Sequence, residues 1–318
     1  MNPWLIVLIA VIGTAALVTA ALCLITYNMA FYRNPKKHKA DPYRAIKDDS
    51  PGSVYSRKLI DHIVSLKYEN IYTESHDGLR LRARLYKVKE DAPFVIQCHG
   101  YKSTPMLDFS GGGALAMEMS MNVIMIDQRA HGESEGRTIS FGLNESRDLS
   151  AWVEYVVKNY GEDRKILLNG ISMGAATVLM ASAMPLPKNV VGIAADCPYS
   201  STKEIIKKVI RDMHLPADIL YPFVRLGARV LGGFDPDKCN PEEAVKSASL
   251  PILLVHGEAD SFVPFYMSER IKASNPNIEF HAFPNADHGK SFIEDTDRYK
   301  TAFIEFSERC LALKNSEN

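Results

Sequence analysis

Short apolar runs that alternate with helical patterns limit most strongly how this chain can fold. Helical stretches lie between the runs, and in the stretch at 145–160 apolar residues fall along one stripe. Strands that are apolar throughout and are joined by helices form a parallel sheet with helices on both faces. We therefore predict an α/β fold around a central, mostly parallel sheet. The five runs lie at 94–98, 123–126, 166–168, 190–195 and 252–255.

Further patterns extend this sheet at both ends. Residues 69–75 and 79–88 alternate between polar and apolar and are joined through an Asp-Gly pair, which predicts an antiparallel hairpin. A short helix is expected at 55–66, before the hairpin. A last strand is expected at 278–283 and a closing helix at 298–313.

One segment breaks the alternation of strands and helices. Between 199 and 250 the sequence shows no clear strand, and helical patterns occur at 203–211 and 219–231. We expect this segment to form a helical cap, inserted at about 200–248 above the sheet, rather than a second independent domain.

An uncharged segment stands near the start of the chain. Residues 4–26 carry no charged side chain, and the segment exceeds the roughly 20 apolar residues that cross a bilayer. A cleaved signal peptide would normally begin with basic residues, which this chain lacks before the segment. We predict an uncleaved transmembrane helix, with the lipid bilayer as its partner. We place Tyr27, Phe31 and Tyr32 in the interfacial belt of aromatic residues.

Basic side chains gather on one side of that segment, at Arg33, Lys36, Lys37 and Lys39. Loops rich in Lys and Arg stay on the cytoplasmic side of a membrane. The sequence therefore predicts a single-pass protein of the cell membrane whose remaining residues lie in the cytoplasm.

The composition argues against two classes of function. Lys and Arg number 37 and Asp and Glu number 38, so net charge gives no argument for binding nucleic acid. The 5 cysteines include no C-x-x-C pair, so the sequence predicts neither a disulfide framework nor a metal site.

The sequence Gly170-Ile171-Ser172-Met173-Gly174 follows one predicted strand and precedes a helical stretch. A nucleophilic serine on a strained strand-to-helix turn needs this context, because the flanking glycines let the backbone bend without side-chain clashes. We predict that Ser172 is a catalytic nucleophile.

A serine hydroxyl needs a base, and the base needs an acid that orients it. His288 follows the last predicted strand and is our candidate base, while Asp260 follows the strand at 252–255 and is our candidate acid. Asp196, at the end of another strand, is the alternative acid. We favour Asp260 because Val263 and Pro264 continue its motif, whereas Asp196 leads directly into the cap.

An oxyanion hole is expected just past the first parallel strand. Two backbone N–H groups aimed at the developing oxyanion stabilise the tetrahedral intermediate of acyl transfer. We assign them to Tyr101, after His99 and Gly100, and to Met173, after the nucleophile. We interpret His99 as a brace for this loop rather than a second base.

The combination of motifs resembles the α/β-hydrolase superfamily and covers roughly 94–313. Within it, the chain is similar to bacterial serine esterases and to prolyl-oligopeptidase-like serine hydrolases. The resemblance implies the α/β-hydrolase fold and supports the roles of nucleophile, acid and base for Ser172, Asp260 and His288, but it implies no substrate. The motifs are His99-Gly100, D-x-R-x-H-G-x-S from Asp127 to Ser134, G-x-S-x-G, H-G-x-x-D-x-x-V-P from His256 to Pro264, and Asp287-His288-Gly289.

We predict a serine hydrolase that cleaves carboxylic esters, lipid-derived esters included, through an acyl-enzyme and without a metal ion or organic cofactor. A serine peptidase or amidase of the prolyl-oligopeptidase-like type, and a non-catalytic binding protein on the same fold, are the alternatives. The expected parts are an anchor at 1–32, a basic tether and linker at 33–54, and a hydrolase domain at 55–318. Because the motifs begin well beyond the tether, removal of residues 1–32 is expected to leave a soluble, active enzyme.

The predicted topology can be tested with a reporter. Alkaline phosphatase fused after Leu313 and expressed in bacteria should stay inactive, because that enzyme folds only outside the cytoplasm. Phosphatase activity is compared with that of a fusion to a secreted protein. Strong activity would overturn the orientation and leave the catalytic assignment standing.

Overall fold

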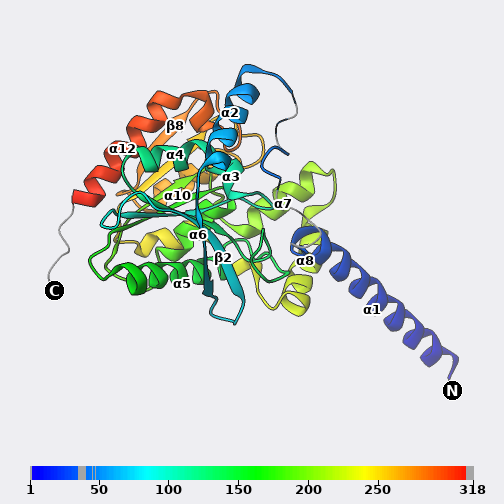
Figure 1. Ribbon diagram of the computed structural model, residues 1–318. Coiled ribbons are helices and arrows are strands. Elements are labelled where there is room, and N and C mark those ends of the chain that lie inside the picture. Colours follow the sequence, from blue (N-terminus) through cyan, green and yellow to red (C-terminus); the bar gives the residue numbers. More distant parts are fainter. Residues whose placement is uncertain (1, 35–40, 45, 47, 313–318) are drawn as a thin grey trace.

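A mostly parallel sheet of eight strands carries the other elements of the chain (Figure 1). The computed structural model describes residues 2–34, 41–44, 46 and 48–312. The strand order is β1-β2-β4-β3-β5-β6-β7-β8, with β1 and β2 antiparallel, β2 and β4 antiparallel, and all other neighbours parallel. This confirms the predicted fold class. The strands are β1 (Glu69–Glu74), β2 (Arg80–Tyr86), β3 (Phe94–Cys98), β4 (Asn122–Asp127), β5 (Ile166–Ile171), β6 (Val190–Asp196), β7 (Ile252–Gly257) and β8 (Glu279–Phe283).

The strand bounds follow the apolar runs, with one systematic difference. Strand β3 has the predicted bounds, whereas β5 and β7 extend beyond the runs at 166–168 and 252–255. In both cases the run stops at a polar residue, Asn169 or His256, that is buried in the strand. The sequence pattern predicts the end of the strand at this polar residue, although the backbone hydrogen bonds to the neighbouring strands continue beyond it.

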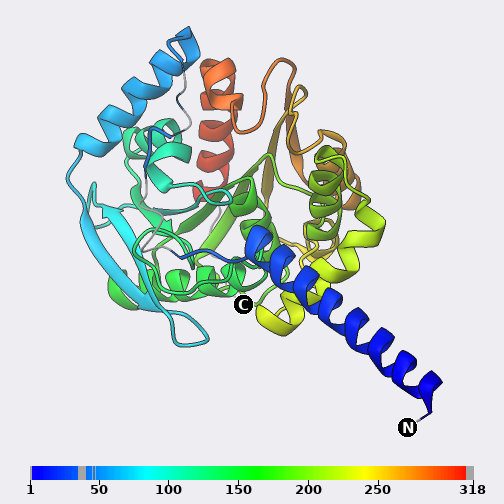
Figure 2. The same cartoon turned by 90° about the vertical axis from the view of Figure 1, so that its right-hand side faces the viewer.

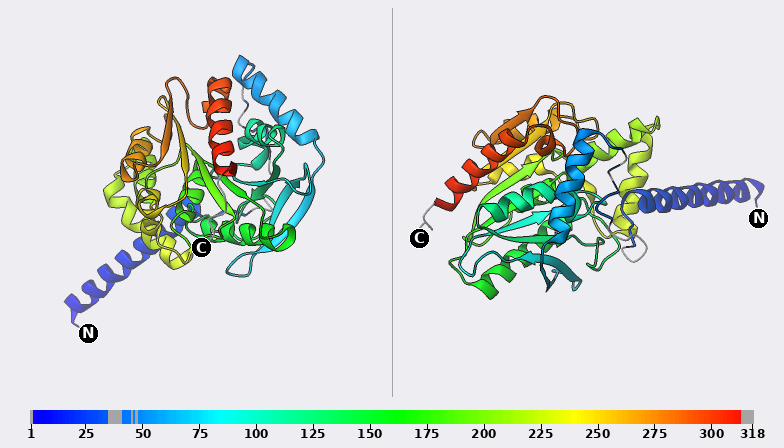
Figure 3. Two further views of the ribbon diagram at one scale, coloured as in Figure 1. Left: turned by 90° about the vertical axis from the view of Figure 1, so that its left-hand side faces the viewer. Right: turned by 45° about the horizontal axis from the view of Figure 1, so that its top comes forward.

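Helices cover both faces of the sheet (Figure 3). One face packs against apolar side chains such as Trp152 and Val178, and the other against side chains such as Ile63 and Phe303. The first face is covered by α5 (Leu143–Tyr160), α6 (Met173–Ala181) and α10 (Tyr266–Ser274), and the second by α2 (Pro51–Ser65), α4 (Ser110–Glu118) and α12 (Thr296–Ala312), with the short helices α3 (Pro105–Asp108) and α11 (Ser291–Glu294) beside them.

Helix α2 begins at Pro51, four residues before the predicted start at 55. The Ser50 hydroxyl accepts a hydrogen bond from the N–H of Ser53, and proline at the first helical position needs no N–H partner. The sequence predicts residues 51–54 as part of the linker, because serine, proline and glycine are also common in turns.

The predicted cap is present between β6 and β7. It consists of α7 (Thr202–Asp212), α8 (Ala217–Leu231), the 3₁₀ turn η1 (Pro236–Lys238), α9 (Pro241–Ala244) and the 3₁₀ turn η2 (Val245–Ser247). Apolar side chains of the cap, such as Ile206 and Val224, form a third cluster with Met173, which follows Ser172 in the chain. The cap is therefore packed directly on the turn that carries the predicted nucleophile.

The N-terminal helix α1 (Pro3–Ala30) projects away from the sheet, as Figure 2 shows. With 28 residues it is about 42 Å long, and no residue of its most apolar 18-residue stretch is buried. By length and composition it can cross a bilayer, a test that a signal sequence near the N-terminus also meets. The basic tether residues Lys36, Lys37 and Lys39 lie outside the described residues.

The last turn of α1 packs within the rest of the protein, contrary to the predicted interfacial belt. Tyr27 and Phe31 are buried, and the Phe31 ring contacts the rings of Phe141 and Phe234 edge-on, with centroids 5.6 and 5.2 Å apart. The N–H of Ile139 donates to the Phe31 carbonyl at 2.8 Å. An aromatic residue after an apolar helix can lie among lipid headgroups or inside a protein core. Here Phe31 lies in a core formed by the cap and the loop at 137–141.

These contacts change what we expect of a truncated chain. Removal of residues 1–32 would take Tyr27 and Phe31 out of the third apolar cluster and expose its remaining members to water. The division at residue 32 stays a proposal, and we now expect the shorter chain to lose stability rather than to behave as a free enzyme.

Phe31→Ala should lower the free energy of unfolding by about 3–5 kcal/mol, because it leaves a cavity among buried rings. Chemical unfolding in detergent, followed by circular dichroism, measures the loss. The control is Met29→Ala, since Met29 lies on the same turn with its side chain exposed and should change little. Equal stability of the two variants would contradict the docking of α1.

Candidate active site

Ser172 lies on a strained turn between β5 and α6. Its backbone angles are φ 56° and ψ −115°, which a residue with a side chain rarely adopts. The turn is tight on both sides: a Cβ atom at Gly170 would lie 2.2 Å from the carbonyl oxygen of Gly174, and one at Gly174 would lie 1.7 Å from that of Cys98. Only glycine fits at these two positions, so the G-x-S-x-G spacing follows from the packing of the turn against β3.

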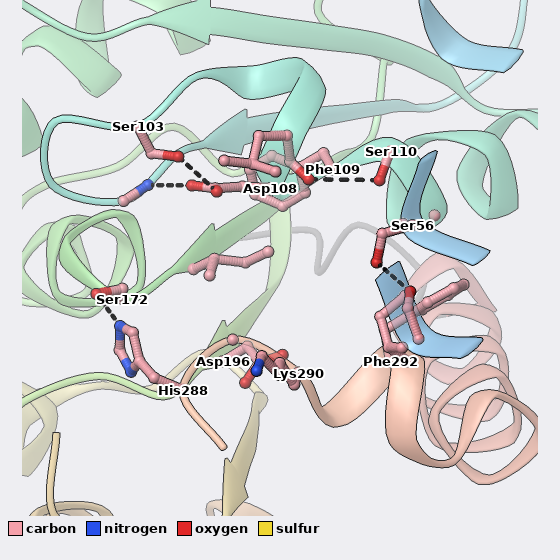
Figure 4. Close-up of a pocket in the computed structure, with 18 of the residues that line it drawn as sticks. Ser56, Ser103, Asp108, Phe109, Ser110, Ser172, Asp196, His288, Lys290 and Phe292 are labelled. Atoms are coloured by element: carbon pink, nitrogen blue, oxygen red, sulfur yellow. Dashed lines mark hydrogen bonds between the residues drawn. The ribbon is translucent and has the colours of Figure 1, made fainter. Parts of the chain in front are cut away.

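His288 lies beside Ser172, as Figure 4 shows, and Asp260 lies beside His288. The Nε2 atom of His288 is 2.9 Å from the Ser172 hydroxyl, and its Nδ1 atom is 2.7 Å from Oδ2 of Asp260. With neutral histidine, the hydroxyl donates to Nε2 and the Nδ1–H group donates to the carboxylate. Three residues far apart in the sequence are thus joined in one chain of hydrogen bonds, in the order expected of nucleophile, base and acid.

Asp260 is held as a carboxylate on both of its oxygens. Oδ1 accepts hydrogen bonds from the N–H groups of Phe262 and Val263 at 2.9 and 2.8 Å. Burial alone would raise the pKa of Asp260, but hydrogen bonds from His256 and His288 outweigh burial and hold that pKa well below its usual range. The carboxylate is therefore charged at neutral pH and can stabilise an imidazolium at His288.

His256 is a positioning residue that the sequence analysis did not identify. Its Nε2 atom lies 3.2 Å from Oδ2 of Asp260 and 2.9 Å from the carbonyl oxygen of Val263, and its Nδ1 atom lies 2.6 Å from the Ser268 hydroxyl. The ring therefore braces the same carboxylate oxygen that His288 contacts. The H-G-x-x-D spacing was the available signal, because it placed this histidine in the same motif as Asp260.

Asp196 lies near the site but does not contact the histidine through a hydrogen bond among the described residues. Its carbonyl oxygen accepts from the N–H of Ser172 at 2.8 Å, and its buried Oδ1 atom has no partner there. Burial raises the pKa of its carboxyl to about 6. This geometry favours Asp260 over Asp196 as the acid.

The loop predicted to supply the oxyanion hole passes directly over Ser172. A Cβ atom at Gly100 would lie 3.4 Å from that of Ser172. The N–H of Gly100 donates to Asp108 at 2.6 Å, which anchors the loop. Tyr101 follows Gly100, and Met173 begins α6, where the first N–H groups have no acceptor within the helix. One predicted donor thus belongs to the loop over Ser172 and the other to the residue after it, and their role in catalysis stays a proposal.

The loop is braced from below by two buried histidines. Nε2 of His99 accepts from the N–H of Gln128 at 3.2 Å, and Nε2 of His131 accepts from the N–H of Lys102 at 3.0 Å. Burial lowers the pKa of both rings, which favours the neutral form that such acceptors require. The D-x-R-x-H-G segment therefore contributes hydrogen bonds that fix the loop.

The same loop is bonded to the N-terminal helix. The Tyr101 hydroxyl donates to the carbonyl oxygen of Ala30 at 2.7 Å, and Nζ of Lys102 donates to that of Met29 at 3.0 Å. Carbonyl groups at a helix C-terminus lack partners within the helix and attract cations. The end of α1 and the predicted oxyanion loop therefore hold each other in place.

A cavity of about 640 Å³ opens beside the Ser172 hydroxyl. One part of its wall is apolar and includes Phe109, Phe262 and Phe292. The ionisable side chains that line it are Arg44, Lys290, Asp48, Asp108, Asp196, His288 and the tyrosines Tyr101 and Tyr299. Helix α2 closes the far side with Ser56, which lies opposite Ser172 and His288 in Figure 4. The cavity can hold a substrate with an apolar body next to the nucleophile.

Two groups of side chains have the spacing of metal ligands. In one, Cys197 lies beside Asp260 and His288, whose nearer atoms already hydrogen-bond to each other. In the other, Asp77 and Asp148 stand with His76, and the Arg129 guanidinium pairs with both carboxylates. Asp260 and His288 are thus paired with each other, and Asp77 and Asp148 with Arg129.

Comparison with known protein families shows which families the sequence matches. Residues 93–238 match the family described as alpha/beta hydrolase fold, and residues 230–311 match the dienelactone hydrolase family. The two matches together span the sheet from β3 onward, the cap and all three residues of the hydrogen-bonded chain.

Two relatives and one solved structure are similar to this chain over two thirds or more of its length. The uncharacterized protein YqkD of Bacillus subtilis is 28% identical over 67% of this chain and 70% of its own length. The alpha/beta hydrolase domain-containing protein WAV2 of Arabidopsis thaliana is 24% identical over 84% of this chain and 87% of its own. The solved structure of an esterase of Pyrococcus furiosus superimposes with a TM-score of 0.63 at 23% identity, covering 88% of this chain and 98% of the esterase.

Asp260→Asn should lower turnover of an activated ester by roughly four orders of magnitude, because the amide cannot hold His288 in the required tautomer or stabilise its cation. The matched control is Asp196→Asn, a buried carboxyl of the same cavity, which should keep most of the activity. Rates at saturating substrate, with circular dichroism to check folding, decide between the two. A larger loss in the Asp196 variant would reassign the acid.

Proposed function

Because this chain is a member of the α/β-hydrolase superfamily, we propose that it is a serine hydrolase that cleaves carboxylic esters at a membrane surface. The observation that carries the proposal is the hydrogen-bonded chain from Ser172 through His288 to Asp260, with distances of 2.9 and 2.7 Å. That chain supplies a nucleophile, a base in reach of its proton and a charged acid that orients the base.

The proposed reaction has two halves. The Ser172 oxygen attacks the acyl carbonyl carbon while its proton moves to Nε2 of His288, and the carbonyl oxygen becomes an oxyanion facing the N–H groups of Tyr101 and Met173. Collapse breaks the bond to the alcohol, which takes the proton from His288. Water then attacks the acyl-enzyme, giving its proton to the same nitrogen, and the serine leaves with a proton restored. Each oxyanion-hole donor of this kind is worth roughly 3–4 kcal/mol to the transition state.

An ester with an apolar acyl or alcohol group fits the cavity best. The Phe262 ring contacts the ring of His288, Phe109 and Phe292 line other parts of the cavity, and a fold of the same kind occurs in the esterase of Pyrococcus furiosus. The position of α1 adds a second argument, because its end is bonded to the loop over the nucleophile. This contact brings the proposed anchor next to the loop over Ser172, which favours an ester derived from membrane lipid.

The membrane part of the proposal rests on α1 itself. Its exposed, uncharged surface would have to be covered, and a bilayer covers a helix of this length. The cytoplasmic orientation rests on the basic residues that follow. Arg33 is buried, and burial and Arg44 lower its pKa to about 10, so within the folded protein it does not reach lipid headgroups. The lysines at 36, 37 and 39 therefore carry the orientation argument.

Fluorophosphonate labelling of the detergent-solubilised protein tests the nucleophile. The wild-type protein and the control Ser182→Ala should be labelled and should hydrolyse p-nitrophenyl esters, whereas Ser172→Ala should lose both properties because only the attacking hydroxyl is removed. Labelling that persists in Ser172→Ala would refute the assignment.

The substrate class is tested with the same preparation. A series of p-nitrophenyl esters of increasing acyl length should show a preference for the longer chains over acetate, because the cavity is apolar near the serine. Faster cleavage of matched anilides than of esters would favour the peptidase or amidase alternative. Absence of both labelling and turnover would favour a binding protein.

A further inference from the structure

Helix α8 of the cap has an apolar stripe that nothing in the described protein covers. Ile219, Leu226 and Val230 are exposed by 66%, 42% and 70%, and Phe223 between them is half-buried. The spacing of these four residues by four, three and four positions places them on one face of the helix. We call this face the α8 stripe.

The stripe is additional to the face that packs the cap. Tyr221, Val224 and Ala228 lie on the opposite side of α8 and are buried in the third apolar cluster. An amphipathic helix of a soluble domain needs only this inner face. The side chains of the outer stripe therefore stay exposed to solvent and do not contribute to the packing of the cap.

Helix α8 lies next to α1, as Figures 1 and 2 show from two directions. The two helices touch at Gly227, where a Cβ atom would lie 2.6 Å from the carbonyl oxygen of Cys23. Gly227 follows Leu226 of the stripe directly. The contact also fixes the level along α1 at which α8 lies, which is the level of Cys23. From Trp4 to Cys23, α1 rises about 28 Å, close to the thickness of a bilayer's hydrocarbon core.

Charged residues flank the stripe on the side away from α1. Arg225 and Arg229 follow the helical periodicity one turn apart. Arg225 pairs with Asp235 at 2.8 Å and with Asp237 at 3.1 Å, so that the exposed Arg229 is the one that can reach a headgroup. Long basic side chains beside an apolar face are typical of helices that lie in a membrane interface, because the stem meets the acyl chains and the head meets phosphate. Met213 and Leu215, in the turn before α8, add two more exposed apolar side chains.

We propose that the α8 stripe contacts the lipid bilayer in which α1 is embedded, so that the cap lies in the membrane interface. The inference rests on the proposed anchoring by α1 and goes beyond it. An anchor alone would leave the distance between the domain and the membrane free to vary. The contact at Gly227 and the α8 stripe together would hold the cap against the bilayer surface. The loop over Ser172, which is bonded to the end of α1, then faces the bilayer.

Fluorescent probes on the full chain in vesicles test this seating. The five native cysteines are all buried, so a thiol-reactive NBD dye will label an introduced cysteine. The test sites are Ile219→Cys and Val230→Cys in the stripe. Val11→Cys marks the exposed part of α1, and Val88→Cys is the control, because Val88 lies at the opposite edge of the sheet, where its N–H donates to Asn122. The vesicles contain phosphatidylcholine with a minority of phosphatidylglycerol.

Lipids that carry a nitroxide near the headgroup should quench the probes at 219 and 230, and leave the probe at 88 as bright as in unlabelled vesicles. The probe at 11 reports the anchor separately and should be quenched by a nitroxide deep in the acyl chain. Quenching at 11 without quenching at 219 and 230 would overturn the seated cap while the anchor stands. A loss of quenching at 11 would refute the anchor itself. Stripe probes that are shielded from water but not quenched by lipid would indicate a second copy of the chain and would also overturn the proposal.

Discussion

The turn at Ser172 is the constraint on which the rest of the site depends. A residue with a side chain is held at φ 56° because Gly170 and Gly174 let the turn press against β3. Such strain persists only where the surrounding structure over-determines it, and here the sheet fixes one side while Met173 is locked in the cap cluster on the other. The hydroxyl is thereby presented at the carboxyl edge of the sheet, within reach of the loops after β7 and β8.

The arrangement links the N-terminal helix to the chemistry. Phe31 closes the apolar cluster under the cap, and the carbonyl groups at the end of α1 accept hydrogen bonds from Tyr101 and Lys102. The proposed anchor is thus part of the structure that fixes the predicted oxyanion loop. One buried ring and two hydrogen bonds thus join the end of α1 to the cap and to the loop over Ser172.

Much of this fold could be predicted because its signals are local. The continuous apolar run of β3 and the motif around Ser172 each depend on neighbours in sequence, and the order of Asp260 and His288 after successive strands suggested that they would meet. The brace at His256 could not be predicted, because its contact with Asp260 depends on how the loop after β7 folds back. The burial of Phe31 was missed for a similar reason: its sequence context is the same beside lipid and beside the cap, and only the tertiary fold distinguishes the two.

The most direct test of the account is a crystal structure of the protein after reaction with an organophosphate ester. We expect phosphorus bonded to the Ser172 oxygen and one phosphoryl oxygen within hydrogen-bond distance of the N–H groups of both Tyr101 and Met173, with His288 still bonded to Asp260. An adduct on another residue, or a phosphoryl oxygen that points away from both N–H groups, would contradict it.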